Sequence, residues 1–441
     1  MKTPSGPKAT ESLVAFMNAA LSAQAAAGYQ ACPQCDLLFI RVEPKPGNRA
    51  RCPRCGCVVA SSSDSPALTT LLLCLTGIIL YFPTIISPIL SMSILWMKQS
   101  GTVLESVAGL FQADYPLVSL AVLLMVVVFP ALVLICLGIV ALSIRIRRVG
   151  RRTALLFRLA LALEEWAMVD VFLVGILVMI FKMTGSVEMK FDGGFLACLA
   201  LALTLISLST VCEHRLFWRR IDHRNPGWAP APALQAPAVG TASEAGLILC
   251  LACQQLQKPA AVCTRCGSPL RERRKGSLGT CWALLLTATI FMFPANLLPI
   301  MEVESLRETT SSTIIDGILF FFEEGNYLVG MIILVASVFV PVLKIIALAT
   351  LLATAQGWNL AMLREKTALY RFISLIGRWS MLDIFVIALL NAMVQFGMLS
   401  SVRVAPAATW FCLVVTTTML ATHFFDPRLM WDAASRRSRD E

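Results

Sequence analysis

The sequence predicts an all-α integral membrane protein made of two tandem four-helix transmembrane units, each preceded by a small cysteine-rich head. Three observations lead to this fold class. The composition is apolar, with 57% hydrophobic residues, 15% charged residues and a mean hydropathy of +0.74. About eight apolar runs are long enough to cross roughly 30 Å of hydrocarbon as helices. Finally, several landmarks recur 211 to 213 residues apart.

The internal repeat is visible in short motifs. A Trp-x-Met-x-Asp pattern ends at Asp170 and again at Asp383, 213 residues later. Pairs separated by 211 residues are Pro83 and Pro294, Pro88 and Pro299, Pro130 and Pro341, and the motifs Cys52-x-x-Cys55 and Cys263-x-x-Cys266. Self-similarity at a fixed offset indicates that one structural unit is present twice.

The chain begins with an Ala-, Ser- and Thr-rich tail at 1–30, which we expect to be mobile, and the first head follows at 31–62. This head contains Cys32, Cys35, Cys52 and Cys55 as two Cys-x-x-Cys pairs. Four thiolates in two knuckles suit tetrahedral zinc, so the pattern predicts a zinc ribbon. A redox-active dithiol is the alternative, but no βαβ pattern surrounds the pairs.

The second head, at 246–270, contains Cys250, Cys253, Cys263 and Cys266. Nine residues separate its two pairs, compared with 16 in the first head, so we expect a smaller ribbon. The predicted cofactor is therefore structural Zn²⁺, about two ions per chain. Most of the other cysteines lie in or beside apolar runs and are expected to be small buried hydrophobic residues.

The membrane units follow the two heads. The first unit, 63–225, has apolar runs at about 68–90, 117–142, 160–183 and 195–217. The second unit, 271–427, has runs at about 280–300, 327–353, 372–398 and 406–424. A Pro/Ala-rich linker at 226–245 joins the halves, and 428–441 forms a charged tail.

The distribution of basic residues predicts the orientation. Of the 37 lysines and arginines, 31 lie in the tail, the heads and alternate loops between spans. By the positive-inside rule, both termini and both heads face the cytoplasm. The net charge of +10 then indicates membrane topology and contact with anionic lipids. Nucleic-acid binding is not expected, because the basic residues are spread over loops that flank the membrane.

Two segments on the opposite side of the membrane, 91–116 and 301–326, are amphipathic and carry Glu105 and Asp316 at matching positions. Paired prolines lead into each segment. They indicate either a kinked or broken helix that lines a cavity, or a helix that ends with proline just beyond it.

Ionisable residues inside spans are costly, and they are therefore candidates for coupling transport to protonation. Span counting places Lys344 and Asp383 at similar depth on successive helices, so an ion pair is geometrically feasible, and Ser380 can extend it. The alternative is that Lys344 extends to the interface and Asp383 braces the bundle. Asp170 is equivalent to Asp383, but Val133 replaces Lys344, so the halves are chemically unequal.

Taken together, the cysteine heads, the two four-span units, the Phe-Pro stretches and the repeated Trp-x-Met-x-Asp resemble the paraquat-inducible protein A family. The resemblance covers about Cys32 to Asp426. It implies zinc ligation by the eight cysteines named above. It also implies a multi-pass protein of the bacterial inner membrane whose partners are an MCE-domain periplasmic tunnel protein and membrane lipids. The implied task is the movement of phospholipid or a related lipid between that membrane and the tunnel.

The chain shows no nucleotide-binding loop and no nucleophile motif, so we do not expect an enzyme. Two other functions are compatible with the residues alone. One is a proton-coupled small-solute transporter that uses Lys344 and Asp383 as a relay. The other is a membrane redox or metal-sensing protein in which the cysteine heads are the active part.

Overall fold

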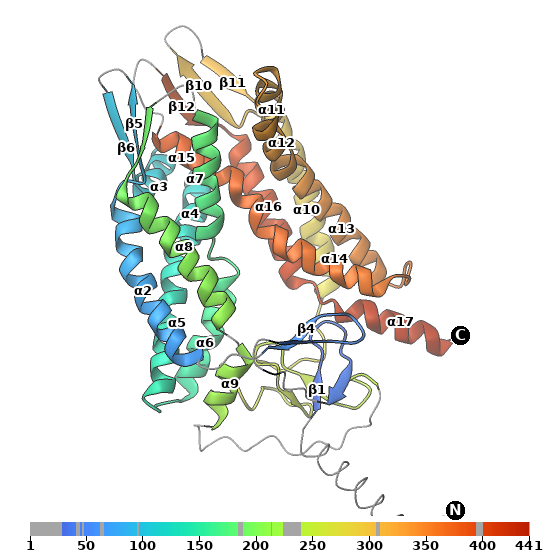
Figure 1. Cartoon of the computed structure of the whole chain (residues 1–441). Coiled ribbons are helices and arrows are strands. Elements are labelled where there is room, and N and C mark those ends of the chain that lie inside the picture. The colour runs from blue at the N-terminus through green and yellow to red at the C-terminus, as the bar shows by residue number, and fades with distance from the viewer. Residues whose placement is uncertain are drawn as a thin grey trace, which may run out of the picture.

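A computed structural model describes residues 29–40, 45, 48–61, 66–94, 97–183, 188–212, 214–223, 240–305, 309–393 and 400–440. Two helical bundles stand side by side, with small β-sheets at one end and the cysteine ribbons at the other (Figure 1). The tail predicted at 1–30 and the linker predicted at 226–245 lie largely outside the described residues.

The first half contains two ribbon hairpins and one helical unit. Its strands and helices are β1 (Tyr29–Ala31), β2 (Leu38–Ile40), β3 (Arg49–Arg51), β4 (Val58–Ser61), α2 (Pro66–Ile86), β5 (Leu90–Ile94), β6 (Met97–Gly101), α3 (Val103–Gln112), α4 (Pro116–Val122), a π-helical turn (Leu123–Val128), α5 (Phe129–Arg145), α6 (Arg151–Glu164), α7 (Val169–Met183), β7 (Glu188–Phe191), α8 (Gly193–Val211) and α9 (His214–His223).

The second half repeats this order after a smaller ribbon. Its elements are β8 (Ile248–Leu249), β9 (Leu256–Gln257), α10 (Ser277–Leu297), β10 (Met301–Ser305), β11 (Thr309–Ser312), α11 (Ile314–Glu323), α12 (Tyr327–Leu334), a π-helical turn (Val335–Phe339), α13 (Val340–Ala355), α14 (Leu363–Ile376), a 3₁₀ turn (Gly377–Met381), α15 (Leu382–Met393), β12 (Ser400–Val404), α16 (Ala407–Phe424) and α17 (Arg428–Asp440).

The chain is a mostly helical membrane protein, as predicted. Among the described residues, seven helical stretches are long and apolar enough to cross a membrane. They are Ala67–Ile86, Pro116–Arg145, Gly193–Val211, Ser277–Leu297, Gly330–Ala355, Leu363–Met393 and Ala407–Phe424. The remaining expected span, at about 160–183, is divided in the structure between the end of α6 and the 15-residue α7.

A π-helical turn precedes the equivalent prolines Pro130 and Pro341. Proline has no N–H and its ring clashes with the carbonyl four residues earlier, and a π turn relieves both problems. In the first unit, the N–H of Phe129 bonds to the carbonyl of Leu124, and the Met125 carbonyl accepts from the N–H of Met168 at 3.1 Å. Pro130 has no N–H to bond to the Met125 carbonyl, so this carbonyl is available to Met168, which lies between α6 and α7.

Each unit also carries a three-stranded antiparallel sheet at the end opposite the ribbons, which the sequence analysis did not predict (Figure 1). The strand orders are β6-β5-β7 and β11-β10-β12. Leu90 pairs with Gly101 and Phe191, and Met301 pairs with Ser312 and Val404. The third strand of each sheet comes from a later loop of its unit, so only the folded chain brings the strands together.

The acidic residues at matching positions in these segments are helix caps. Glu105 closes a capping box with Thr102 at the start of α3, and Asp316 does the same with Thr313 at the start of α11. The paired prolines lie near the ends of the preceding helices. Pro83 lies inside α2, which continues to Ile86. The equivalent α10 also continues past its proline. The geometry therefore corresponds to a helix end near proline rather than to a broken helix.

The two units meet through α7 and α15, which lie near the middle of the molecule (Figure 1). The rings of Phe172 and Phe385 pack edge to face with centroids 5.7 Å apart, and both side chains are buried. These residues are equivalent in the repeat, 213 positions apart. Two equivalent residues in mutual contact indicate a pseudo-twofold axis between the units.

Candidate functional site

The four cysteines of each ribbon come together in a buried cluster. In each cluster the Sγ atoms all lie within 4.8 Å of one another. Contact distances are 3.5 Å for Cys32–Cys55 and 3.6 Å for Cys35–Cys52. A tetrahedral zinc with Zn–S bonds of about 2.3 Å separates its sulfurs by roughly 3.8 Å, so the cluster fits such an ion.

The second cluster has the same geometry despite its shorter gap. Its contact distances are 3.6 Å for Cys250–Cys266 and 3.5 Å for Cys253–Cys263. The hydroxyl of Ser268 lies 3.2 Å from the Cys250 sulfur and 3.0 Å from the Cys266 sulfur. The predicted ligand sets are thus assembled in both ribbons, and both can hold a metal ion.

Each Cys-x-x-Cys pair is built on the same backbone turn. The residue after the second cysteine has a positive φ, and its N–H donates to the carbonyl of the first cysteine at 2.8–3.0 Å. The residues in this position are Asp36, Gly56, Gln254 and Gly267. Glycine adopts this conformation at low cost, whereas Asp36 and Gln254 adopt it less readily. The sequence contains a signal for this turn at Gly56 and Gly267, and no such signal at Asp36 and Gln254.

Hydrogen bonding among the four thiols of each cluster lowers the pKa of some and raises the pKa of others, such as Cys35 and Cys253. Hydrogen bonds from Cys32, Cys35 and Cys55 lower the pKa of the Cys52 thiol. Hydrogen bonds from the other three cysteines of the second ribbon likewise lower the pKa of the Cys250 thiol. One sulfur in each cluster is therefore stabilised as a thiolate, which is the form that binds metal.

In the second unit, Lys344 lies on α13 and is almost completely buried, with 2% of its surface exposed. Its Nζ donates to Oγ1 of Thr418 on α16 at 2.9 Å. A Cβ added at Gly377 would lie 3.9 Å from this nitrogen, so the lysine reaches the 3₁₀ turn Gly377–Met381. Ser380 lies in that turn, and Asp383 lies in the first turn of α15 directly after it.

Two more hydroxyls belong to this region. The Oγ atoms of Ser337 and Ser380 are buried and have no hydrogen-bond partner among the described residues. Buried hydroxyls are normally hydrogen-bonded, and an ordered water can supply the partner where protein groups do not. The structure thus gathers buried polar groups from three segments of the second unit.

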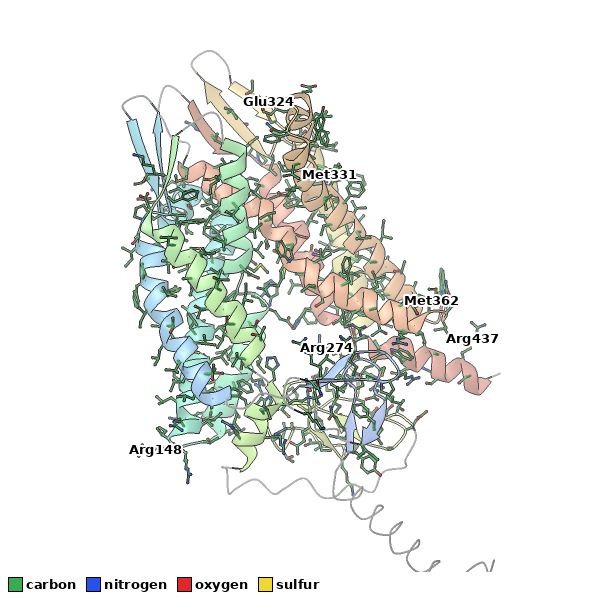
Figure 2. The ribbon with its side chains drawn as sticks, in the orientation of Figure 1. Arg148, Arg274, Glu324, Met331, Met362 and Arg437 are labelled. Atoms are coloured by element: carbon green, nitrogen blue, oxygen red, sulfur yellow. The ribbon has the colours of Figure 1, made fainter. Side chains whose placement is uncertain are left out.

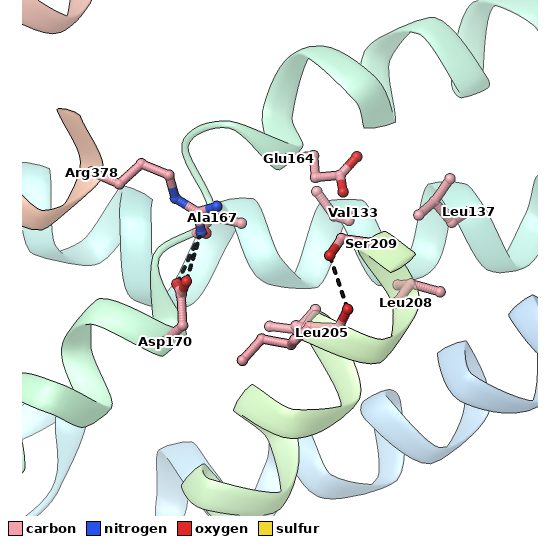
Figure 3. A pocket seen from close by; sticks show the side chains of 10 residues that line it. Val133, Leu137, Glu164, Ala167, Asp170, Leu205, Leu208, Ser209 and Arg378 are labelled. Atoms are coloured by element: carbon pink, nitrogen blue, oxygen red, sulfur yellow. Dashed lines mark hydrogen bonds and ion pairs between the residues drawn. The ribbon is translucent and has the colours of Figure 1, made fainter. Parts of the chain in front are cut away.

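The first unit has a cavity of about 90 Å³ (Figure 3). Its lining residues are Val133, Leu137, Glu164, Ala167, Asp170, Leu205, Ile206, Leu208, Ser209 and Arg378. Arg378 enters from the second unit, and its Nη2 lies 2.9 Å and 3.1 Å from the two carboxylate oxygens of Asp170 (Figure 3). The same nitrogen donates to the carbonyl of Ala167 at 2.8 Å.

The family model described as Paraquat-inducible protein A matches residues 68–222 and 278–435, one stretch in each unit. The chain belongs to the paraquat-inducible protein A family. The chain is 34% identical over 420 residues to Intermembrane transport protein PqiA of Escherichia coli (strain K12), across 94% of this chain and 98% of that protein.

Two further relatives are similar over nearly the whole chain. Lipophilic envelope-spanning tunnel protein A of Escherichia coli (strain K12) is 30% identical over 408 residues, which is 92% of this chain and 91% of the relative. Probable intermembrane transport protein of Haemophilus influenzae is 28% identical over 418 residues, which is 92% of this chain and 96% of the relative. No solved structure matches the chain.

In this family member, the cavity and the Lys344 site occupy equivalent places in the two units. Val133, Ala167, Asp170 and Leu205 line the cavity, and their counterparts are Lys344, Ser380, Asp383 and Thr418. The second unit therefore has four polar side chains at positions where the first unit has three apolar residues and Asp170. Each place contains an aspartate and is reached by one cation, Lys344 from its own unit or Arg378 from the opposite unit.

Sequence reasoning did not identify Arg378 as the partner of Asp170. The signal was present, because Arg378 directly precedes Trp379 in the second Trp-x-Met-x-Asp motif, where the first motif has Glu165. A pairing between residues 208 positions apart depends on how the two units pack, which no local pattern encodes.

Proposed function

We propose that this chain is the inner-membrane subunit of an intermembrane lipid transport system. In this role it passes phospholipid or a related lipid between the inner membrane and a periplasmic tunnel formed by an MCE-domain protein. The observation that carries the proposal is similarity over 94% of the chain to a protein named for intermembrane transport. A second relative, named as part of a lipophilic envelope-spanning tunnel, supports the lipid as cargo.

The proposed orientation places both ribbons and both termini in the cytoplasm. Arg148, Arg274 and Arg437 lie toward the ribbon end of the molecule, and Glu324 lies at the opposite end (Figure 2). This polarity is what the positive-inside rule expects if the ribbon end is cytoplasmic. The two β-sheets would then face the periplasm, on the side of the tunnel partner.

We propose further that both ribbons bind zinc in a structural role and that the chain itself catalyses no reaction. Four sulfur ligands close a tetrahedral site and leave no position for a substrate, which is typical of structural zinc. The eight cysteines would hold the two ions, and the ions would supply cross-links that small ribbons need because their apolar cores are limited.

The proposed coupling site is formed by Lys344, Ser380 and Asp383, with Asp170 as the counterpart in the first unit. Lys344 is buried and its Nζ donates to the neutral hydroxyl of Thr418, so burial of its ammonium form carries a desolvation cost. A change in protonation here would change the packing of α13 against the turn before α15. That turn also carries Arg378, so the change can reach the interface between the units.

Co-purification tests the proposal. We expect the chain, extracted gently from the membrane, to retain bound phospholipid and an MCE-domain partner, both detectable by mass spectrometry. Proton-dependent uptake of a small solute without either would favour the proton-coupled transporter. Thiol-dependent activity without bound lipid would favour the redox or metal-sensing protein.

A further inference from the structure

The first ribbon docks on the second unit, although it precedes the first unit in sequence. Arg371 of α14 donates from Nη1 to the carbonyl of Cys55 at 3.2 Å and to Oε1 of Gln34 at 2.8 Å. The guanidinium of Arg54 lies 4.4 Å from the ring centroid of Trp431 on α17, a cation–π contact. Trp431 is buried in the same apolar cluster as the four ligand cysteines of this ribbon.

An ion-pair bridge strengthens this docking. Arg273, just before α10, donates to Asp36 at 2.9 Å and to the two carboxylate oxygens of Asp432 at 2.6 Å and 2.8 Å. Asp36 is the positive-φ residue of the first knuckle, and its side chain is 3% exposed. The turn that positions two of the ligand sulfurs is therefore held directly by the second half of the chain.

The second ribbon docks on the first unit in the same way. Arg158 of α6 donates from Nη1 to the carbonyl of Cys266 at 3.4 Å. Arg215 of α9 donates to Oε1 of Gln254 at 2.6 Å, and the guanidinium of Arg265 lies 5.9 Å from the ring centroid of Trp218. The four cysteines of this ribbon belong to the large apolar cluster that also includes Phe157, Phe217 and Trp218 of the first unit.

The two ribbons contact their opposite units through equivalent residues. Pairs separated by 213 residues are Arg158 and Arg371, and Trp218 and Trp431. Pairs separated by 211 residues are Cys55 and Cys266, and Arg54 and Arg265. The arginine bond to a cysteine carbonyl and the arginine–tryptophan contact therefore occur in both halves, as a pseudo-twofold axis predicts. The Arg273 bridge belongs to the first ribbon and the Arg215–Gln254 bond to the second.

Seven residues after Arg371 and after Arg158, the chain makes a second polar contact with the opposite unit. Seven residues are about two helical turns, which returns to nearly the same face. On the α14 side, Arg378 pairs with Asp170 of the first unit at 2.9 Å. On the α6 side, Glu165 lies 3.2 Å from the ring nitrogen of His423 in the second unit.

We infer that the two ribbons form a reciprocal clasp, in which the metal-bound fold of each ribbon holds the ribbon-side helix of the opposite unit in place. The first ribbon holds α14 and thereby positions Arg378 in the cavity beside Asp170. The second ribbon holds α6 and thereby positions Glu165 beside His423. Loss of metal from one ribbon releases the opposite unit rather than its own.

Hydrogen–deuterium exchange on the full-length chain tests whether each ribbon stabilises the opposite unit. Cys55→Ser disables the first ribbon, and Cys266→Ser is the matched change in the second. We expect Cys55→Ser to accelerate amide exchange in Leu363–Met381 about tenfold and to leave Arg151–Glu164 unchanged, because one charge-assisted hydrogen bond shifts a local equilibrium by roughly that factor. Cys266→Ser should do the reverse. Faster exchange only in each ribbon's own unit would overturn the inference.

A second experiment keeps the first ribbon intact and disables only the second. In a Cys250→Ser, Cys253→Ser chain only the first ribbon can hold zinc, and zinc release to a chelator reports on that ribbon alone. Arg371→Ala should speed this release about tenfold, by the same reasoning. Arg158→Ala should leave the rate of zinc release unchanged. Arg371→Lys should give an intermediate rate, because the point charge of lysine cannot replace the planar guanidinium of arginine.

Equal release rates in Arg371→Ala and the parent chain would refute the clasp, as would acceleration by Arg158→Ala. The inference rests on the proposed metal binding, but the experiments can contradict the clasp without contradicting the metal binding. A chain that contains zinc and shows no crossed effect contradicts the clasp alone. Crossed changes in amide exchange in Arg371→Ala and Arg158→Ala would support the crossed docking whatever the ion.

Discussion

Lys344 and Val133 occupy equivalent positions, and this difference adds a buried cation to the second unit alone. Lys344 is buried against Thr418, whereas Val133 lines a cavity. Asp383 and Asp170 are likewise equivalent, but Asp170 pairs with an arginine from the opposite unit. Lys344, Asp383 and Asp170 can therefore be tested individually.

For the coupling site, we expect Asp383→Asn to abolish function while the protein still accumulates and still binds its partner. Asparagine keeps the volume of the side chain but cannot change its protonation state. Lys344→Met, which keeps the length of the side chain and removes the charge, should have the same effect. Complementation of envelope permeability, compared with protein abundance in the membrane, is the measurement. A fully functional Asp383→Asn strain would end the coupling hypothesis.

The pair of Asp170 and Arg378 predicts an energetic coupling between the units. Both side chains are about one third exposed, at 31% and 32%, so we expect the pair to contribute about 1 kcal/mol, between exposed and buried pairs. Asp170→Asn, Arg378→Gln and the double variant form a double-mutant cycle that thermal unfolding can follow. Strictly additive effects on stability would show that the two side chains do not interact.

At the scale of elements, the start of α8 packs tightly against the turn between α2 and β5. A Cβ added at Gly194 would lie 2.5 Å from the carbonyl oxygen of Pro88 and 2.6 Å from that of Ser87. Backbone cannot move aside easily, so Gly194→Ala should destabilise the protein by about 1–3 kcal/mol. Gly193→Ala is the control, because nothing lies within 4 Å of the added atom. Similar melting temperatures for the two variants would contradict this packing.

The ribbons predict a defined metal content. Elemental analysis of freshly purified protein should find about two zinc ions per chain, one for each Cys₄ cluster. Cys52→Ser should remove one of them. Cys57→Ser should retain both, since Cys57 lies beside the first cluster but outside its ligand set. A chain purified without zinc would refute the zinc hypothesis.

At the scale of the whole molecule, the orientation can be tested by labelling. Ser100 is exposed on β6, at the end opposite the ribbons, and Arg148 is exposed toward the ribbon end. A membrane-impermeant thiol reagent should label Ser100→Cys from the periplasm and Arg148→Cys only after the inner membrane is opened. The described native cysteines are buried, which limits background labelling. The reverse pattern would show the opposite orientation.

Much of the architecture was predictable from local patterns. Apolar runs located the membrane helices, because each helix satisfies its own backbone hydrogen bonds in lipid. Spaced cysteines identified both Cys₄ clusters that can hold a metal, because the cysteines of one ribbon lie close together in sequence. The break between α6 and α7 was missed. It depends on a hydrogen bond from Met168 to the Met125 carbonyl, which Pro130 and the π-helical turn leave available.

The sequence by itself determined the two-unit repeat, the membrane helices, the eight cysteine ligands and the candidate charges at Lys344, Asp383 and Asp170. Only the tertiary structure decided how those parts meet. It placed Arg378 beside Asp170 and aligned the strands of the two small sheets. It also docked each ribbon on the unit of the opposite half. The physical reason is that periodicity and ligand spacing act over a few residues, whereas these contacts join residues about 100 to 316 positions apart and depend on complementary surfaces that form only when the halves pack.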